Sequence, residues 1–139
     1  MIYNLTDISI VGALKLQSNP QISKNVIERE IGMRFIHLAD VHLGAVPDRG
    51  CPWSSRREEE IWETFRRVIA GIRENPVDLL FIAGDLFHRQ PLLRELKEVN
   101  NLFSTIPDTR VYLMAGNHDY IKADSFYRDF QWEKNVTFF

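Results

Sequence analysis

The chain has 139 residues, which is enough for one domain or less. Its hydrophobic content of 45% and charged content of 26% are typical of a soluble globular protein, and a net charge of −2 gives no overall signal for nucleic-acid binding. The single cysteine, Cys51, excludes an intrachain disulfide. Because no apolar run approaches the roughly 20 residues of a membrane span and the N-terminus lacks a basic signal-like region, we expect a cytoplasmic protein that does not enter a membrane.

The first 32 residues differ in pattern from the rest. Residues 8–14 predict a short strand, and no group of ligand-type side chains follows it. The sequence Glu28-Arg29-Glu30 can be encoded by a purine-rich ribosome-binding site just upstream of Met33. Residues 1–32 are therefore either a translated leader or a genuine N-terminal arm, with residues 33–139 as the domain proper. A mass measurement showing that the natively expressed protein retains residues 1–32 would refute the leader.

From Met33 onward, predicted strands alternate with predicted helices. Short apolar runs predict strands at 35–39, 77–83 and 110–115, and the nearly continuous first run is typical of a strand buried on both faces.

Helical periodicity predicts one helix from Ser55 to Asn75, opened by a capping box of Ser55 and Glu58, and another from Pro91 to Ile106. A short helix at 123–130 and a strand at 135–139 complete the pattern. Such alternation predicts an α/β fold of βαβ units with a largely parallel sheet.

Polar residues follow each of the first three predicted strands. Asp40 and His42 come after the first, Asp85 and His88 after the second, and the run Gly116-Asn117-His118-Asp119 after the third. Because parallel strands place their carboxyl ends at one edge of a sheet, we expect these three loops to converge there.

The residue types in these loops suit a divalent metal site. Asp40 and His42, two residues apart at the end of an extended strand, would point the same way and hold one cation. Gly84 lets the backbone turn sharply, and the two oxygens of Asp85 could bridge two metals about 3.5–4 Å apart. Asn117 offers a carbonyl oxygen that suits a hard or borderline metal.

The neighbouring residues suggest further roles. His118 could donate a proton to a leaving oxygen or bind a phosphate, and Asp119 could orient His118 or a ligand. Taken singly, each of these residues could instead be a turn former or a helix cap, and only their recurrence after successive strands favours the metal site. His37 lies inside a strand and is predicted to be a hydrogen-bonded core histidine. The arginines of the first helix alternate with glutamates, which predicts a solvated face with ion pairs.

Three sequence blocks carry a specific resemblance. Residues 35–44 (FIHLADVHLG), 84–88 (GDLFH) and 116–119 (GNHD) resemble, in order and spacing, the first three signature blocks of the calcineurin-like metallophosphoesterases. Within that family they are most similar to the SbcD-type exonucleases, the nuclease subunits of the double-strand-break repair complex. The resemblance runs from Met33 to the end of the chain.

The resemblance implies a role for each matching residue. The metal ligands, with Asp85 as the bridge, would be Asp40, His42, Asp85 and Asn117. His118 would be the catalytic histidine beside the scissile phosphate, and His88 a phosphate contact that the nuclease branch carries and many phosphatases lack. Gly84, Gly116 and Asp119 would position these ligands and histidines without binding the metal themselves.

The resemblance also implies cofactors, a reaction and partners. Two divalent ions, usually Mn²⁺ with Mg²⁺, Fe²⁺ or Zn²⁺ as alternatives, would activate a water that attacks phosphorus. The substrate would be DNA, and the partners an SMC-like ATPase and a second copy of the chain. The alternatives are a phosphatase or small-molecule phosphodiesterase on the same scaffold, or a non-catalytic fragment.

The sequence departs from the family pattern at its C-terminal end. Later family blocks supply one more histidine and a Gly-His-x-His pair, whereas this chain has four histidines and none after His118. We therefore expect only the N-terminal part of the fold, with the second half of the sandwich missing, weak or no activity, and an uncovered apolar sheet face.

Overall fold

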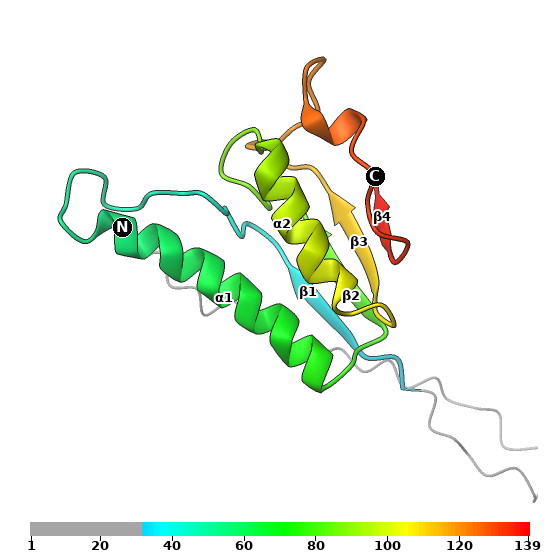
Figure 1. The fold of residues 1–139 in the computed structure, drawn as a ribbon. Coiled ribbons are helices and arrows are strands. Elements are labelled where there is room, and N and C mark those ends of the chain that lie inside the picture. Colours follow the sequence, from blue (N-terminus) through cyan, green and yellow to red (C-terminus); the bar gives the residue numbers. More distant parts are fainter. Residues whose placement is uncertain (1–31) are drawn as a thin grey trace, which may run out of the picture.

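The computed structural model describes residues 32–139 and shows a single parallel sheet with two helices (Figure 1). The strand predicted at 8–14, and both interpretations of residues 1–32, lie outside the described residues. No helix within residues 32–139 combines the length and apolar character needed to cross a bilayer.

The sheet has the strand order β1-β2-β3-β4, and every pairing is parallel. Its strands are β1 (Phe35–Leu38), β2 (Leu79–Ala83), β3 (Arg110–Met114) and β4 (Val136–Phe138). Parallel neighbours need crossover connections, and helices α1 (Ser54–Glu74) and α2 (Leu93–Ser104) supply the first two. The predicted α/β fold, consistent with part of a metallophosphoesterase fold, is confirmed.

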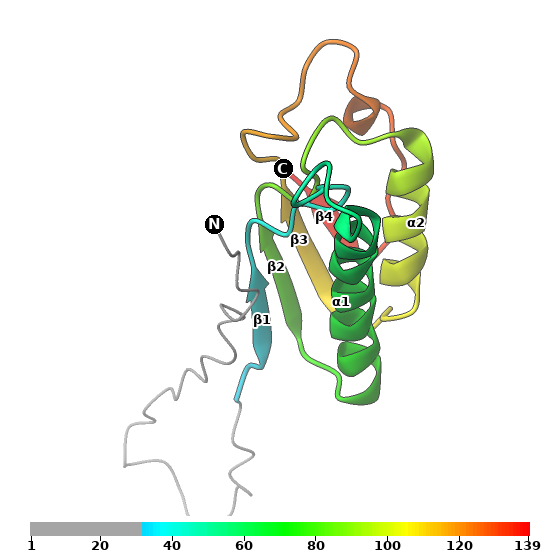
Figure 2. The ribbon, with the colours of Figure 1, turned by 90° about the vertical axis from the view of Figure 1, so that its left-hand side faces the viewer.

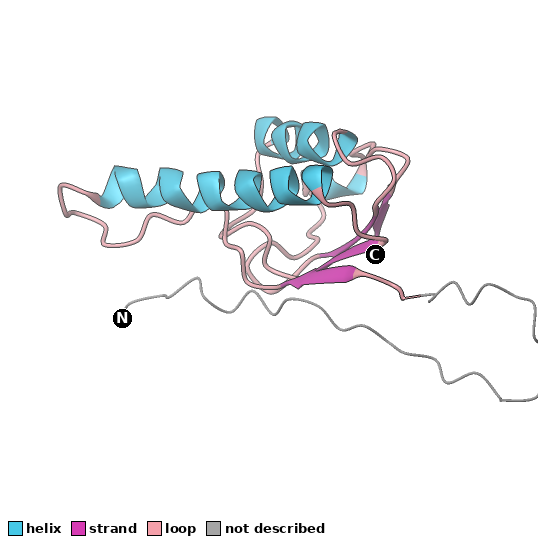
Figure 3. Cartoon of the chain, turned by 90° about the horizontal axis from the view of Figure 1, so that it is seen from below, coloured by secondary structure: helices cyan, strands magenta, loops and turns pink. Residues whose placement is uncertain are grey.

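Both helices cover the same face of the sheet (Figures 2 and 3). The predicted apolar stripe of α1 is buried at Phe65, Ile69 and Ile72. It packs with the buried face of α2 over the sheet residues that alternate inward. These inward residues are Leu80, Ile82, Val111 and Leu113.

The opposite face of the sheet has no helix over it within the described residues, as Figure 3 shows. An aromatic row runs across it through three contacts, Phe35 to Phe81 at 6.0 Å, Phe81 to Tyr112 at 5.5 Å and Tyr112 to Phe139 at 6.0 Å between ring centroids. The prediction that the strand at 35–39 is buried on both faces is therefore wrong, because only one face is covered. His37 is exposed rather than buried in the core, which corrects the other expectation for β1.

Two local predictions also change. Helix α1 begins at Ser54 after Trp53 with no side-chain cap, so the capping box of Ser55 and Glu58 does not form. The Ser54 hydroxyl instead donates to the Cys51 carbonyl oxygen at 2.9 Å. The helix predicted at 123–130 is only a 3-10 turn, η1 (Phe126–Arg128), capped by the Ser125 hydroxyl.

Candidate metal centre

The three polar loops converge at the carboxyl edge of the sheet, as predicted. Beyond the ends of β1 and β2, the pairing continues through the loops: the His42 amide donates to the Asp85 carbonyl oxygen at 2.9 Å, and the Leu43 amide donates to the Leu86 carbonyl oxygen at 2.8 Å. The His88 amide then donates to the Leu43 carbonyl oxygen at 3.0 Å. Backbone hydrogen bonds therefore fix the first two loops side by side.

Asp40, His42 and Asp85 form a group with metal-ligand chemistry. Each offers one ligand atom, and these atoms lie within 4.8 Å of one another. His42 Nε2 lies 3.9 Å from Asp40 Oδ1, and Asp85 is buried with 5% of its surface exposed. Carboxylate oxygens and one imidazole nitrogen suit hard and borderline divalent cations, so these residues fit the metal that the sequence predicts.

The backbone of this group differs from the prediction. Asp40, His42 and Asp85 have φ angles of 53°, 54° and 50°, in the left-handed region that non-glycine residues rarely adopt. Because β1 ends at Leu38, Asp40 and His42 do not face the same way through an extended strand. They meet through left-handed turns, each costing roughly 1–2 kcal/mol, and such strain is concentrated at functional sites.

Two glycines let the second and third loops approach each other. Gly84 has a φ of 88°, and a Cβ on it would lie 3.2 Å from the Gly116 Cα. A Cβ on Gly116 would lie 2.6 Å from the Asp85 Cγ and closer still to the Asp85 Oδ1 and backbone nitrogen. In the space this leaves, the His118 amide donates to Asp85 Oδ1 at 2.8 Å. The prediction that both glycines support the site therefore gains a steric reason.

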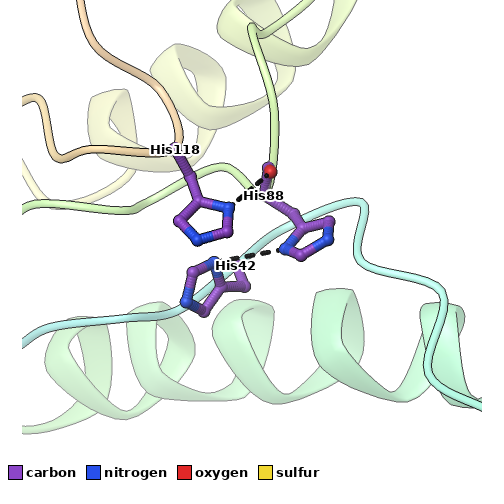
Figure 4. Close-up of side chains that lie close together, drawn as sticks. All are labelled: His42, His88 and His118. Carbon is purple, nitrogen blue, oxygen red and sulfur yellow. Dashed lines mark hydrogen bonds between the residues drawn. The ribbon is translucent and has the colours of Figure 1, made fainter.

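Three histidines, one from each loop, face one another beside this group (Figure 4). The imidazoles of His42, His88 and His118 also offer ligand nitrogens within 4.8 Å of one another. His42 Nδ1 lies 3.4 Å from His88 Nδ1, and His118 Nδ1 lies 3.1 Å from the His88 carbonyl oxygen. Burial lowers the pKa of His88, and the charges of His42 and His118 lower it further, so His88 favours the neutral form.

Asp119 connects the second and third loops. It is fully buried, and its Oδ1 accepts from the Gly116 amide at 2.7 Å. Its Oδ2 accepts from the Phe87 amide at 3.1 Å and the Tyr127 hydroxyl at 2.9 Å. Asp119 thus holds the loops that carry His88 and His118 instead of bonding to the His118 ring.

Sequence reasoning missed Tyr127 and the pair formed by Arg89 and Glu95. Burial raises the pKa of Tyr127, and the Asp119 carboxylate raises it further, so the phenol stays protonated and donates. The Arg89 guanidinium makes a bidentate pair with Glu95, at 2.8 and 3.0 Å, which joins the His88 loop to α2. The spacing from Arg89 to Glu95 gave no signal, because Arg89 lies in the loop before α2 and Glu95 in the first turn of the helix, so the interval of six residues lies within no single helix or strand.

Asn117 lies between Gly116 and His118 with its side chain exposed, so its role as a ligand stays a prediction. A groove of about 590 Å³ runs from the histidines along α1. The helix side of the groove carries charges of both signs, from Arg57, Glu60, Glu63 and Arg67.

Comparison with known proteins identifies the class that this sheet and this loop cluster define. The profile of the calcineurin-like phosphoesterase family matches residues 33–139, and the chain belongs to that family.

Several curated proteins are similar to part of this chain. The DNA double-strand break repair protein Mre11 of Methanopyrus kandleri is 40% identical over 90 residues, covering 63% of this chain and 19% of the relative. Mre11 of Archaeoglobus fulgidus is 39% identical over 98 residues, covering 66% and 20% respectively. The uncharacterized metallophosphoesterase YhaO of Bacillus subtilis is 33% identical over 118 residues, covering 77% and 28%. The chain thus spans only 19% to 28% of the length of these relatives.

Proposed function

We propose that this chain carries the N-terminal part of the active site of a metal-dependent phosphodiester hydrolase that cleaves DNA. The observation that supports this most directly is the ligand group of Asp40, His42 and Asp85 lying beside the imidazoles of His88 and His118. The first three residues provide cation ligands and the last two provide groups that can bind a phosphate.

Four residues would act as metal ligands. Asp40, His42, Asp85 and Asn117 would hold two divalent ions, with Asp85 as the bridge, and the bound ions would polarise the phosphoryl group and lower the pKa of a water. The His118 amide donates to Asp85 Oδ1 at 2.8 Å, which orients this carboxylate before a cation binds.

The two remaining histidines would act on the phosphate. The contact between His118 Nδ1 and the His88 carbonyl oxygen places the ring proton on Nδ1, because a carbonyl oxygen can only accept. His118 Nε2 can therefore take up a proton and deliver it to a leaving oxygen. His88, which favours the neutral form, would hydrogen-bond a phosphate oxygen.

The similarity to Mre11 proteins, which are named for DNA double-strand break repair, supports DNA as the substrate, as does His88, which by resemblance is typical of the nuclease branch. The groove along α1 offers a path for a strand, but its mixed charges mean that bound cations would supply most of the attraction. The same resemblance extends the proposal to Mn²⁺ as the metal, an SMC-like ATPase and a second copy as partners, and a cytoplasmic location.

The first test is Mn²⁺ uptake by the 139-residue chain, followed by electron paramagnetic resonance. We expect Asp85→Asn to abolish uptake because it removes charge from the bridging ligand. Asp48→Asn is the matched control, since Asp48 has the same left-handed conformation, with a φ of 53°, but lies outside the ligand group. Absence of Mn²⁺ uptake by the wild-type chain would contradict the proposal.

The second test compares cleavage of linear DNA with cleavage of a small phosphomonoester in Mn²⁺. We expect the chain to prefer DNA, and we expect His88→Ala to reduce DNA cleavage more than phosphomonoester cleavage. A preference for the phosphomonoester that survives His88→Ala would favour a phosphatase.

A further inference from the structure

The histidine cluster has the geometry of a metal site in its own right. His42, His88 and His118 come from three different loops, and their ring centroids lie 4.7 to 5.3 Å apart. Two imidazoles bound tetrahedrally to zinc, with Zn–N distances of about 2.0–2.1 Å, place their nitrogens roughly 3.3–3.4 Å apart. His42 Nδ1 and His88 Nδ1 lie 3.4 Å apart, so these two rings are already at that spacing.

The third ring is oriented as a metal-bound histidine is. His118 Nδ1 donates to the His88 carbonyl oxygen at 3.1 Å, which leaves Nε2 with its lone pair. A histidine ligand commonly donates its other ring N–H to a backbone carbonyl in this way, and the bond fixes both tautomer and ring orientation. Figure 4 shows the other nitrogen of His118 on the side of His42.

The donor set selects the kind of cation. Three neutral imidazoles with no carboxylate among them suit Zn²⁺, Cu²⁺ or Ni²⁺, whereas Mg²⁺ and Mn²⁺ favour oxygen donors. A three-histidine site that leaves one position open is a known zinc arrangement. The adjacent group of Asp40, His42 and Asp85 has the opposite preference, since two of its three donors are carboxylates.

We propose that His42, His88 and His118 form a separate Zn²⁺ site, and that His42 makes this site and the carboxylate site mutually exclusive. The two ring nitrogens of His42 face different groups: Nδ1 lies 3.4 Å from His88, and Nε2 lies 3.9 Å from Asp40. A neutral imidazole has one lone pair on its ring nitrogens and one N–H. Zinc on Nδ1 leaves an N–H facing Asp40, and a cation on Nε2 leaves an N–H facing His88.

The exclusion rests on the proposed metal-dependent function, whereas zinc binding by the three histidines does not. Zinc would act as an antagonist of that function by withdrawing one ligand from the carboxylate site. It would also occupy the two histidines proposed to bind phosphate.

The test uses Co²⁺, a visible-light reporter for Zn²⁺, on the 139-residue chain. We expect the intense absorption bands of four-coordinate Co²⁺, and we expect Zn²⁺ to remove them. His88→Ala should abolish the bands and weaken Zn²⁺ binding by about 100-fold or more, exceeding the ~10–100-fold cost of losing an outer hydrogen-bond partner. His37→Ala is the matched control, because His37 is the remaining histidine of the chain, is exposed, and lies outside the cluster.

Mn²⁺ binding, followed by electron paramagnetic resonance, separates the two sites. We expect His88→Ala to change Mn²⁺ affinity by less than about twofold, and Asp40→Asn to weaken Mn²⁺ binding while the Co²⁺ bands remain. Bands that survive His88→Ala, or disappear in Asp40→Asn, would overturn the histidine site. Simultaneous binding of Zn²⁺ and Mn²⁺ would overturn the exclusion. Co²⁺ bands without any Mn²⁺ binding would support the histidine site and contradict only the proposed function.

Discussion

At the scale of single residues, Gly116 has the least room for a side chain of the glycines in residues 32–139. A Cβ there would meet the buried Asp85, whose Cγ would be 2.6 Å away. The Gly116 backbone cannot retreat freely, because its amide donates to Asp119 at 2.7 Å. We therefore expect Gly116→Ala to displace Asp85, to abolish Mn²⁺ uptake and to lower the free energy of unfolding by about 1–3 kcal/mol, as overpacking does.

Gly71 provides the control for this substitution. It lies inside α1, and a Cβ added there meets nothing within 4 Å. Gly71→Ala should therefore raise the free energy of unfolding by roughly 0.5–1 kcal/mol and leave Mn²⁺ uptake unchanged. Urea unfolding and Mn²⁺ titration of both variants check this, and equal effects at the two glycines would contradict the steric argument.

Asp119 stabilises the fold because its carboxylate accepts hydrogen bonds from three donors. The Phe87 amide, the Gly116 amide and the Tyr127 hydroxyl all donate to this carboxylate. The substitution Asp119→Asn would replace one carboxylate oxygen by an NH₂ group, which cannot accept, so at least one of these donors would face another donor. We expect a loss of about 2–3 kcal/mol in the free energy of unfolding, which is the cost of leaving a buried donor unsatisfied next to a mismatched group.

Tyr127→Phe removes only one of these hydrogen bonds and keeps the ring in the core. We expect it to lower the free energy of unfolding by about 1 kcal/mol, since Asp119 Oδ2 keeps its bond from Phe87. Urea unfolding distinguishes the two variants. If Asp119→Asn costs no more than Tyr127→Phe, Asp119 is not what holds the loops together.

At the scale of elements, the sequence predicted the strands and helices because their signals are local. The apolar stripe of α1 and Pro76, which ends the helix, both lie in one continuous stretch of the sequence, so they can be recognised without knowing the fold. The start of α1 was mispredicted because Ser54 bonds to the Cys51 carbonyl, an alternative that the capping pattern cannot exclude. Burial of β1 was overestimated because a hydrophobic run says how apolar a strand is but not whether anything covers it.

The sequence predicted which residues meet at the site, but it did not predict the backbone conformation that brings them together. Asp40, His42 and Asp85 follow strands that share one edge, and topology alone brings them together. Their left-handed backbone depends on bonds between loops, such as that from His42 to Asp85, which no single segment encodes. The same holds for the bonds of Asp119 to Phe87 and Tyr127.

Helix α2 should control the order of the His88 loop through Glu95. Glu95 is buried, pairs with Arg89 at 2.8 Å, and accepts from the Leu92 amide at 2.7 Å. We expect Glu95→Ala to cost about 1–3 kcal/mol of unfolding free energy, because it leaves these donors without their partner. It should also weaken Co²⁺ binding through the displaced His88.

Glu98→Ala, one turn later on α2, is the matched control. Glu98 pairs with Arg66 at 2.7 Å near the surface, and Arg66 keeps a second partner in Glu59. Surface pairs contribute about 0–1 kcal/mol, so this variant should unfold nearly as the wild type does and keep Co²⁺ binding. Urea unfolding and Co²⁺ titration measure both effects, and similar losses in the two variants would show that the buried pair has no special role.

At the scale of the whole molecule, the helices protect only one side of the sheet. In residues 32–139, the other side presents the row of Phe35, Phe81, Tyr112 and Phe139. A contiguous apolar patch of this kind is the surface that marks an interaction site or an aggregation risk. The predicted consequence is that the folded chain binds the dye anilinonaphthalene sulfonate, which fluoresces on apolar surface.

Tyr112 is the position to test, because it joins Phe81 to Phe139 in the centre of the row. Tyr112→Thr interrupts the row while keeping a residue that favours strands, so dye fluorescence should fall by half or more with the circular dichroism unchanged. Tyr120→Thr is the control, since Tyr120 is 55% exposed and lies outside the row. If fluorescence falls equally in both variants, or in neither, the dye does not bind to the aromatic row. The prediction that this face of the sheet is accessible in solution would then be wrong.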